Sequence, residues 1–329
     1  MRVVAIGGGT GLSCVLRGLK RHVRGSDRPP GADALIRRLT AIVTVTDEGG
    51  SSGRLRREFR ILPPGDIRNC LVALAEDERL MTQLFQYRFS SGHGLKGHSL
   101  GNLFLTALTH LTSDFAQAVR LSSEVLAIRG EIVPATLADV RLKARLRDGR
   151  VISGESRISR TRIPIRRLEM DPARCRPLPE TIEAIKNADL ITMGPGSLYT
   201  SLIPNLLVHG IPEAIRKSHA VKVFVCNLMT QPGETRDFSA SAHLRAVADH
   251  VGEGLFDYVV LNNREMSRRL RRRYHAGRAE PVANDLLDVR AAGVQPVLAS
   301  LLVEDGVARH DPEKLAKLLL SLARRPPAA

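Results

Sequence analysis

Two glycine-rich turns, at residues 7–11 and 194–197, are the first candidates for chemistry in this chain. Each follows a short apolar run, and the first precedes a helical pattern with Leu12, Val15, Leu16 and Leu19 on one face. Glycine permits positive φ and close backbone approach, and a helix N-terminus offers free N–H groups to an anion. We therefore predict a phosphate or diphosphate site at Gly8, Gly9, Thr10, Gly11, Gly194, Gly196 and Ser197. The alternative is a pair of tight turns without a ligand.

Neither turn completes a known nucleotide fingerprint. Counted from Gly7, the last glycine of a GxGxxG motif falls on Leu12, and counted from Gly9 it falls on Cys14. No Gly-Lys-Ser/Thr follows, so the first turn is not a P-loop. The sequence therefore disfavours an NAD-dependent dehydrogenase.

Polar residues follow the second and a later apolar run. Asp47 comes after Leu39–Thr46, where a carboxylate could accept ribose hydroxyls, bind Mg²⁺ or cap the next helix. Ser51 and Ser52 add donors, and Arg54 is the arginine nearest to them. Asn227 likewise follows the apolar run Val221–Cys226. All three readings of Asp47 remain open at this point.

Two further segments open helices. In the first, Asp66 is either a helix N-cap or, with Arg68 and Asn69, part of a cleft wall. In the second, His98 and Asn102 lie among small and polar residues. His98 could donate to a phosphate, act as a general acid or base, or be structural.

The elements that would position these residues alternate between β-rich runs and helical patterns. This order predicts an α/β, doubly wound, mostly parallel Rossmann-like sheet, with ligands outside the carboxyl ends of its strands. Alternating residues around Asp148-Gly149 predict a small antiparallel β-hairpin insertion at about 130–170. We also expect a surface loop at 26–32, a last strand at 297–302 and a last helix at 311–323.

Composition narrows the function classes. The 329 residues are 43% hydrophobic, which excludes a disordered chain, and no apolar run is long enough to span a membrane. The N-terminus lacks a signal-peptide pattern and the four cysteines are far apart, so we expect a cytoplasmic protein with reduced thiols. The net charge of +15 has two explanations. It reflects either an arginine-rich coding bias with a solvated surface, or a preference for an anionic ligand. With 4% aromatics and no binding motif, nucleic acid is not an expected partner.

Six segments together resemble the gluconeogenesis factor family (YvcK type) of the CofD-like, or 2-phospho-L-lactate transferase, superfamily. They are GGGTGL (7–12), VTDEGGSSGRLR (45–56), PPGDIRNCL (63–71), GHSLGNL (97–103), GPGSLYTS (194–201) and NLMTQPGET (227–235). The resemblance implies a single CofD-like α/β domain over residues 1–329. It also implies binding of a UDP-sugar such as UDP-N-acetylglucosamine, a role in gluconeogenic growth, and maintenance of the cell wall and cell shape.

The resemblance also assigns roles in the C-terminal part. It implies that Tyr274 stacks on the uracil ring and that Arg309 pairs with the diphosphate. The residues alone equally allow an exposed tyrosine and a strand-end arginine. Superfamily analogy favours a homodimer, and regulation implies protein partners.

The alternative is a Mg²⁺-dependent transferase of a phosphorylated or nucleotide-linked group, with Asp47 binding metal and His98 moving protons. The family's usual Asp-Asp pair is Asp47-Glu48 here, which weakens a two-acid metal site. The SSGRLR and PPGDIRN segments resemble the gluconeogenesis factor branch, so we favour binding over catalysis, with the UDP-sugar as ligand, no certain cofactor and Mg²⁺ as the optional one.

Overall fold

A computed structural model describes residues 1–24 and 35–324, and the loop expected at 26–32 lies outside them. Its main sheet has seven parallel strands in the order β10-β9-β8-β7-β1-β2-β3. Their bounds are β1 Arg2–Gly7, β2 Arg38–Val43, β3 Glu131–Pro134, β7 Leu190–Met193, β8 Val221–Val225, β9 Tyr258–Asn262 and β10 Gln295–Ala299. The predicted α/β, doubly wound fold is confirmed.

The strand order changes direction between β1 and β7. The chain moves outward from β1 to β2 and β3, then returns to β7 and moves the other way through β8, β9 and β10. Because parallel crossovers are right-handed, the helices that connect the strands of the two halves lie on opposite faces of the sheet, while the last helix of the chain returns to the face of the first. This reversal puts the topological switch point at the carboxyl ends of β1 and β7, the position where open α/β sheets bind ligands.

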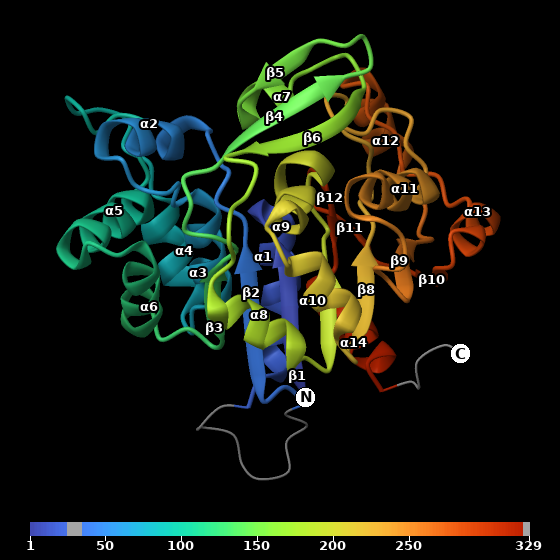
Figure 1. The fold of residues 1–329 in the computed structure, drawn as a ribbon, viewed down its shortest axis with the longest axis horizontal. Helices are drawn as coiled ribbons and strands as arrows, with labels where there is room; N and C mark the ends of the chain where they lie inside the picture. Colours follow the sequence, from blue (N-terminus) through green and yellow to red (C-terminus); the bar gives the residue numbers. More distant parts are fainter. Residues whose placement is uncertain (25–34, 325–329) are drawn as a thin grey trace.

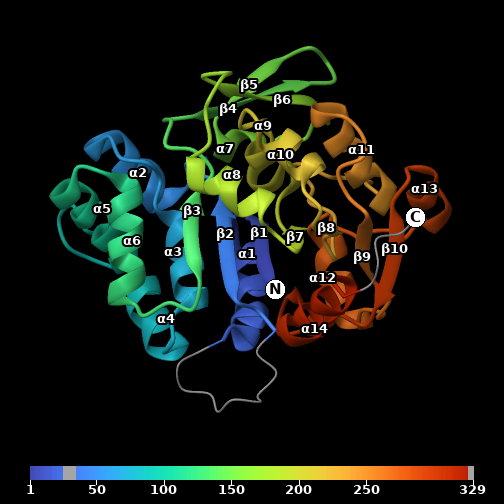
Figure 2. The same ribbon diagram turned by 60° about the horizontal axis from the view of Figure 1, so that its bottom comes forward.

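Helices cover both faces (Figures 1 and 2). The first half contributes α1 Gly9–Leu19, α2 Gly50–Phe59, α3 Gly65–Leu74, α4 Glu78–Gln86, α5 Leu100–Thr112 and α6 Phe115–Val125. The second contributes α8 Pro179–Lys186, a π-helical turn at Leu198–Leu202, α9 Ile203–Leu207, α10 Ile211–Lys217, α11 Ala240–Val251, α12 Arg268–Ala276, α13 Leu286–Ala291 and α14 Pro312–Leu322. The predicted apolar face Leu12, Val15, Leu16 and Leu19 of α1 is buried, and α1 packs against α3 and α14. In the described part of the chain, no helix has the length and apolar character needed to cross a membrane.

A three-stranded antiparallel sheet lies beyond the carboxyl ends of the main strands (Figure 1). It consists of β4 Arg141–Leu146, β5 Val151–Ser153 and β6 Ile165–Asp171, with the short helix α7 Glu155–Ile158 between β5 and β6. The antiparallel insertion therefore exists, but its predicted start near 130 was too early. Residues 131–134 pair with β2 as the edge strand β3, and one-sided burial gives an edge strand the same alternation as a hairpin.

A second antiparallel pair was not predicted. The expected last strand at 297–302 is β10 at 295–299, followed by the hairpin of β11 Leu302–Glu304 and β12 Ala308–His310. The Asn262 side-chain oxygen accepts hydrogen bonds from the backbone N–H groups of Leu301 and Leu302, at 3.0 and 3.1 Å. These bonds hold residues 301 and 302 beside the end of β9, so the chain leaves the main sheet after β10. The last helix is confirmed, with Asp311 as its N-cap.

A buried arginine of α2 fastens the antiparallel insertion to the core. The Arg56 guanidinium donates to the Val140 carbonyl at 2.6 Å and lies 2.5 Å from Asp139 and 3.6 Å from Glu48. Glu48 in turn accepts the Glu155 backbone N–H at 3.1 Å. Arg56 and Glu48 thus hold the insertion above the β2–α2 loop.

We expect Arg56→Ala to lower the free energy of unfolding by about 2 kcal/mol, because it removes a buried charged donor and leaves the Val140 carbonyl unpaired. Urea denaturation of the variant measures this change. Arg57→Ala is the matched control, since Arg57 is exposed on the same helix. Equal costs for the two variants would contradict the fastening role.

Candidate functional site

The two glycine turns touch each other at the change in strand order. A Cβ atom on Gly11 would lie 2.1 Å from the Pro195 carbonyl oxygen, so only glycine permits this approach. Gly9 has a φ of +61° and Gly194 a φ of +81°, both in the region that favours glycine. The predicted turns are therefore one structural unit, joining β1 to β7 at the switch point.

The N-terminus of α1 opens from this unit. Its N-cap is Gly8, which makes no side-chain cap, and its first turn carries no acidic residue. Thr10 is exposed, and Gly9 and Gly11 are partly exposed. Since the first N–H groups of a helix have no partner within the helix, this end can receive an anion.

Asp66 lies beside the same helix end. It was predicted as a possible N-cap of the next helix, but α3 begins at Gly65 with Pro64 as its N-cap and no side-chain capping bond. Asp66 instead accepts a hydrogen bond from the Gly9 backbone N–H. The Pro-Pro-Gly turn starts α3 two residues earlier than the capping pattern predicts.

Asp47 and Asp66 form an acidic pair, and each carboxylate packs against the backbone of a glycine. A Cβ on Gly8 would lie 2.5 Å from an Asp66 oxygen, and one on Gly65 would lie 2.1 Å from an Asp47 oxygen. Burial and the neighbouring Asp47 raise the pKa of Asp66 well above its usual range. Asp47 also accepts the Gly49 N–H at 2.8 Å. The site therefore places protonatable oxygens next to the predicted phosphate site.

Metal binding at this pair depends on additional ligands. Within residues 1–24 and 35–324, no group of three or more His, Cys, Asp or Glu side chains is arranged to hold a metal ion. Mg²⁺ in proteins commonly combines one or two carboxylates with phosphate oxygens and water. An ion at Asp47 would thus need oxygens from a bound phosphate.

The structure places the other polar residues of the first half in an internal network. His98 is only 2% exposed, and its Nδ1 lies 2.9 Å from Ser51 Oγ. Asn102 donates to Ser52 Oγ at 3.3 Å and accepts from Arg68 at 3.1 Å. Burial lowers the pKa of His98, and nearby Arg54 lowers it further. These bonds hold α2, α3 and α5 together.

Two more predicted residues have structural partners nearby. Asn69 accepts from the Arg68 guanidinium at 2.8 Å. Arg54 donates to the carbonyls of Lys96 and Gly94, at 2.6 and 3.1 Å. Arg54 thereby holds the loop before α5.

The turn after β7 is bound to the end of β8. Asn227 accepts the Gly196 N–H at 3.0 Å and donates to the Gly196 carbonyl at 2.8 Å. Ser197 Oγ accepts from the Gln231 side chain at 2.8 Å. Asn227, predicted as a ligand-binding residue, therefore connects the switch point to the end of β8.

The β11–β12 hairpin brings Tyr274 and Arg309 to the same place. Tyr274 Oη accepts the Ala308 N–H at 2.9 Å, next to Arg309, which is exposed. The Cys14 thiol of α1 donates to the His310 carbonyl at 3.2 Å. Burial raises the pKa of Cys14 to about 11, while the charges of Arg17 and Arg309 oppose this rise. Arg309 therefore lies near α1, one helical turn after Thr10.

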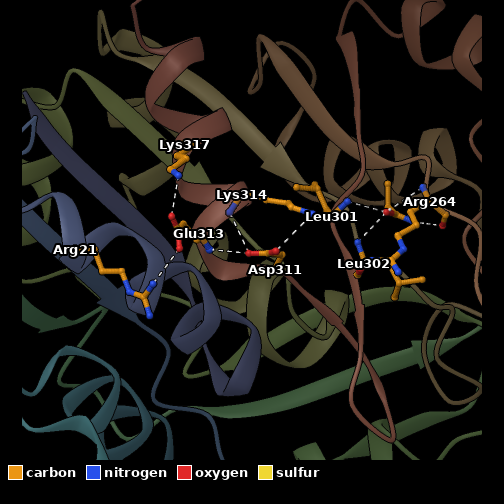
Figure 3. A network of polar contacts seen from close by, with 9 residues as sticks. Arg21, Arg264, Leu301, Leu302, Asp311, Glu313, Lys314 and Lys317 are labelled. Atoms are coloured by element: carbon orange, nitrogen blue, oxygen red, sulfur yellow. Dashed lines mark hydrogen bonds and ion pairs between the residues drawn. The ribbon is translucent and has the colours of Figure 1, made fainter. Parts of the chain in front are cut away.

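Hydrogen bonds from Asp311 and from Arg264 hold the base of the β11–β12 hairpin (Figure 3). Asp311 donates its N–H to the Leu301 carbonyl at 2.7 Å, and Arg264 donates to the Leu302 carbonyl at 2.9 Å. Asp311 also caps α14 through the N–H groups of Glu313 and Lys314. The position of Arg309 is thus set by contacts at the hairpin base.

Comparisons with known proteins agree with this arrangement. The family model "2-phospho-L-lactate transferase CofD" matches residues 3–302. The "Gluconeogenesis factor" of Bacillus subtilis strain 168 is 47% identical over 98% of this chain and 98% of its own length. This chain belongs to the CofD family, in its gluconeogenesis factor branch. The resemblance inferred from the six segments is therefore confirmed.

Other relatives of this CofD-family chain cover it equally well. A protein of Nostoc sp. strain PCC 7120 is 53% identical over 97% of this chain and 68% of its own length. The crystal structure of a UPF0052 family member from Bacillus halodurans has a TM-score of 0.90 at 46% identity, covering 97% of this chain and 98% of that chain. The fold is thus shared along nearly the whole sequence.

Two carboxylates near this candidate site were not predicted. Glu234, which is 5% exposed, accepts from the Tyr199 N–H and the Thr200 hydroxyl, both at 2.8 Å. Burial raises the pKa of Glu234 to about 7. Glu155 comes from the insertion, and burial and the charge of Asp47 raise its pKa. Glu234 lies in the NLMTQPGET segment, which was a usable signal, whereas nothing local marks Glu155.

Proposed function

We propose that this chain is a cytosolic regulatory protein that binds a UDP-sugar and supports gluconeogenic growth and the maintenance of the cell wall and cell shape. The observation that supports the proposal is the contact between the N-terminus of α1 and the turn at 194–197 at the switch point. The hairpin bearing Arg309 packs against the next turn of the same helix, at Cys14. The name of the Bacillus subtilis relative supports the gluconeogenic role.

In this proposal, the diphosphate lies at the N-terminus of α1, where backbone N–H groups and the helix dipole favour negative charge. Arg309 adds a guanidinium that can donate two parallel hydrogen bonds to phosphate oxygens. Tyr274 presents a ring for the base, with its hydroxyl already bound to the hairpin. Asp47 accepts sugar hydroxyls.

The test is calorimetric titration with UDP-N-acetylglucosamine, UDP-glucose, NAD and GDP, each with and without Mg²⁺. We expect micromolar binding of the UDP-sugars alone, without turnover. Mg²⁺-dependent turnover that Asp47→Asn abolishes would replace this proposal with the transferase named by the family model.

Arg309→Ala is expected to weaken UDP-sugar binding tenfold or more, because a charge-assisted pair contributes about 1.5–3 kcal/mol. The same titration measures the change. Arg290→Ala, an exposed arginine on α13, is the control and should bind normally. Unchanged affinity in a folded Arg309→Ala variant would remove Arg309 from the site.

A further inference from the structure

A groove of about 390 Å³ lies along the outer edge of the main sheet, beside β3. Residues 130–134 line it together with one face of α6 and the segment at 178–180, where α8 begins. Figure 2 shows β3 between α6 and α8, at the opposite end of the sheet from β10. None of the described residues that line this groove was predicted for the glycine-turn site, so the groove is a separate feature.

The backbone of β3 is paired on one side only, because β3 is the last strand of the sheet and β2 is its neighbour. The Ala135 N–H donates to the Val43 carbonyl at 2.8 Å, which fixes the alternation along the strand. Residues 131, 133 and 135 therefore face β2, and Ile132 presents its N–H and C=O to the other side. Within the described residues, no group bonds to the Ile132 backbone on that side. The groove thus contains an open hydrogen-bonding edge.

Pro134 limits the length of this edge. Proline has no N–H, and the Pro134 carbonyl already accepts from Thr181 Oγ1 at 3.5 Å. The four residues of β3 span about 13 Å, at about 3.3 Å per residue. The occupant that fits is therefore a short extended segment centred near Ile132.

Apolar side chains lie on both sides of the open edge. They come from the strand, from α6 and from the start of α8, and they are Ala116, Ile132, Val133, Pro134 and Leu178. Successive side chains of a strand point to opposite faces, so Ile132 and Val133 serve the two faces of an added strand. Because side chains of adjacent strands contact those on the same face, apolar residues are favoured in the middle of the occupant.

The rim of the groove is acidic, although the whole chain has a net charge of +15. Glu124, Glu131 and Glu180 line it and are exposed. Arg38 pairs with Glu131 at 2.8 Å. Arg120 lies 3.9 Å from Glu180. In contrast, the Glu124 side chain has no hydrogen bond or ion pair within residues 1–24 and 35–324. The surplus charge of the rim is negative, so it favours a cationic partner and opposes a second copy of the same rim.

We propose that the β3 groove binds a short extended peptide segment of a partner protein, with apolar residues in its middle and lysine or arginine beside them. The segment adds to the edge of the sheet through the Ile132 backbone, and its cationic side chain pairs with Glu124. Main-chain hydrogen bonds supply affinity in this mode of recognition, and side-chain contacts supply specificity.

The experiment titrates the full-length protein with two fluorescently labelled peptides, Lys-Val-Thr-Val-Lys and Glu-Val-Thr-Val-Glu, and measures anisotropy. The lysine peptide should bind about tenfold more tightly, because its charge complements the rim. Two N-methylated forms then test strand addition, one modified at the threonine nitrogen and one at both valine nitrogens. One form should lose about tenfold affinity and the other little, because alternate backbone groups of a strand face its neighbour.

Glu124→Lys should weaken binding of the lysine peptide about tenfold, because it replaces attraction with repulsion. Glu253→Lys makes the same charge change at an exposed carboxylate outside the groove and should bind normally. Hydrogen–deuterium exchange should show that the lysine peptide protects residues 130–134 in the wild type, and melting curves confirm that each variant is folded.

Three results would overturn the peptide site. They are failure of the lysine peptide to bind at millimolar concentration, equal binding of the two peptides, and equal effects of the two N-methylation patterns. Protection of residues 130–134 that rises with protein concentration, without any peptide, would instead make a second copy of this chain the occupant.

Discussion

Gly11→Ala is expected to lower the free energy of unfolding by about 3 kcal/mol, at the upper end of the cost of overpacking. The added Cβ would lie 2.1 Å from the Pro195 carbonyl oxygen and 2.6 Å from its carbonyl carbon. Both are backbone atoms, so relief requires the β1 and β7 turns to separate. Urea denaturation measures the loss, and a lower UDP-sugar affinity should accompany it.

Gly7→Ala is the matched control for this effect. Gly7 belongs to the same turn, but a Cβ there would make ordinary contacts, 3.4 Å from Leu202 and 3.5 Å from Leu12. We expect it to cost less than about 1 kcal/mol. If the two variants were equally stable, the close approach of the glycine turns would not exist in solution.

Glu234→Gln should remove a pH-dependent loss of stability of about 3 kcal/mol. Burial raises the pKa of Glu234 from 4.5 to about 7 in the folded protein. Between these values the folded state keeps a proton that the unfolded state has lost. Stability from this group is therefore complete at low pH and falls as the pH rises toward and past about 7.

Urea denaturation at several values between about pH 5 and pH 8 measures this effect as the difference between variant and wild type. Glutamine also loses one acceptor for the Tyr199 N–H or Thr200 hydroxyl, but that cost is constant with pH. Glu253→Gln, at an exposed carboxylate, is the control and should follow the wild-type profile. Parallel profiles for Glu234→Gln and wild type would show that Glu234 is already ionised in the folded protein.

Local patterns in the sequence were sufficient for most elements of the main sheet. The apolar runs at 3–6, 190–193 and 221–226 are central strands, because such strands are buried on both faces and need apolar residues throughout. The edge strand β3 was harder to predict, because its buried and exposed residues alternate as in the antiparallel insertion. Only its pairing with β2 shows that it belongs to the main sheet. The β11–β12 hairpin depends on Asn262, some 40 residues earlier, so no local pattern predicts it.

The candidate site divides in the same way. The sequence by itself determined that glycine turns follow two strands, because glycine is required wherever backbone must approach backbone closely. It also placed Asp47 and Asn227 at strand ends. Only the tertiary structure decided that the two turns touch and that His98 is buried. Likewise, only the fold brings Asp66 to α1, Glu155 to Asp47, and Arg309 to Cys14. These contacts join residues far apart in the chain, and their pairing energy depends on packing and burial that arise only when the sheet has formed.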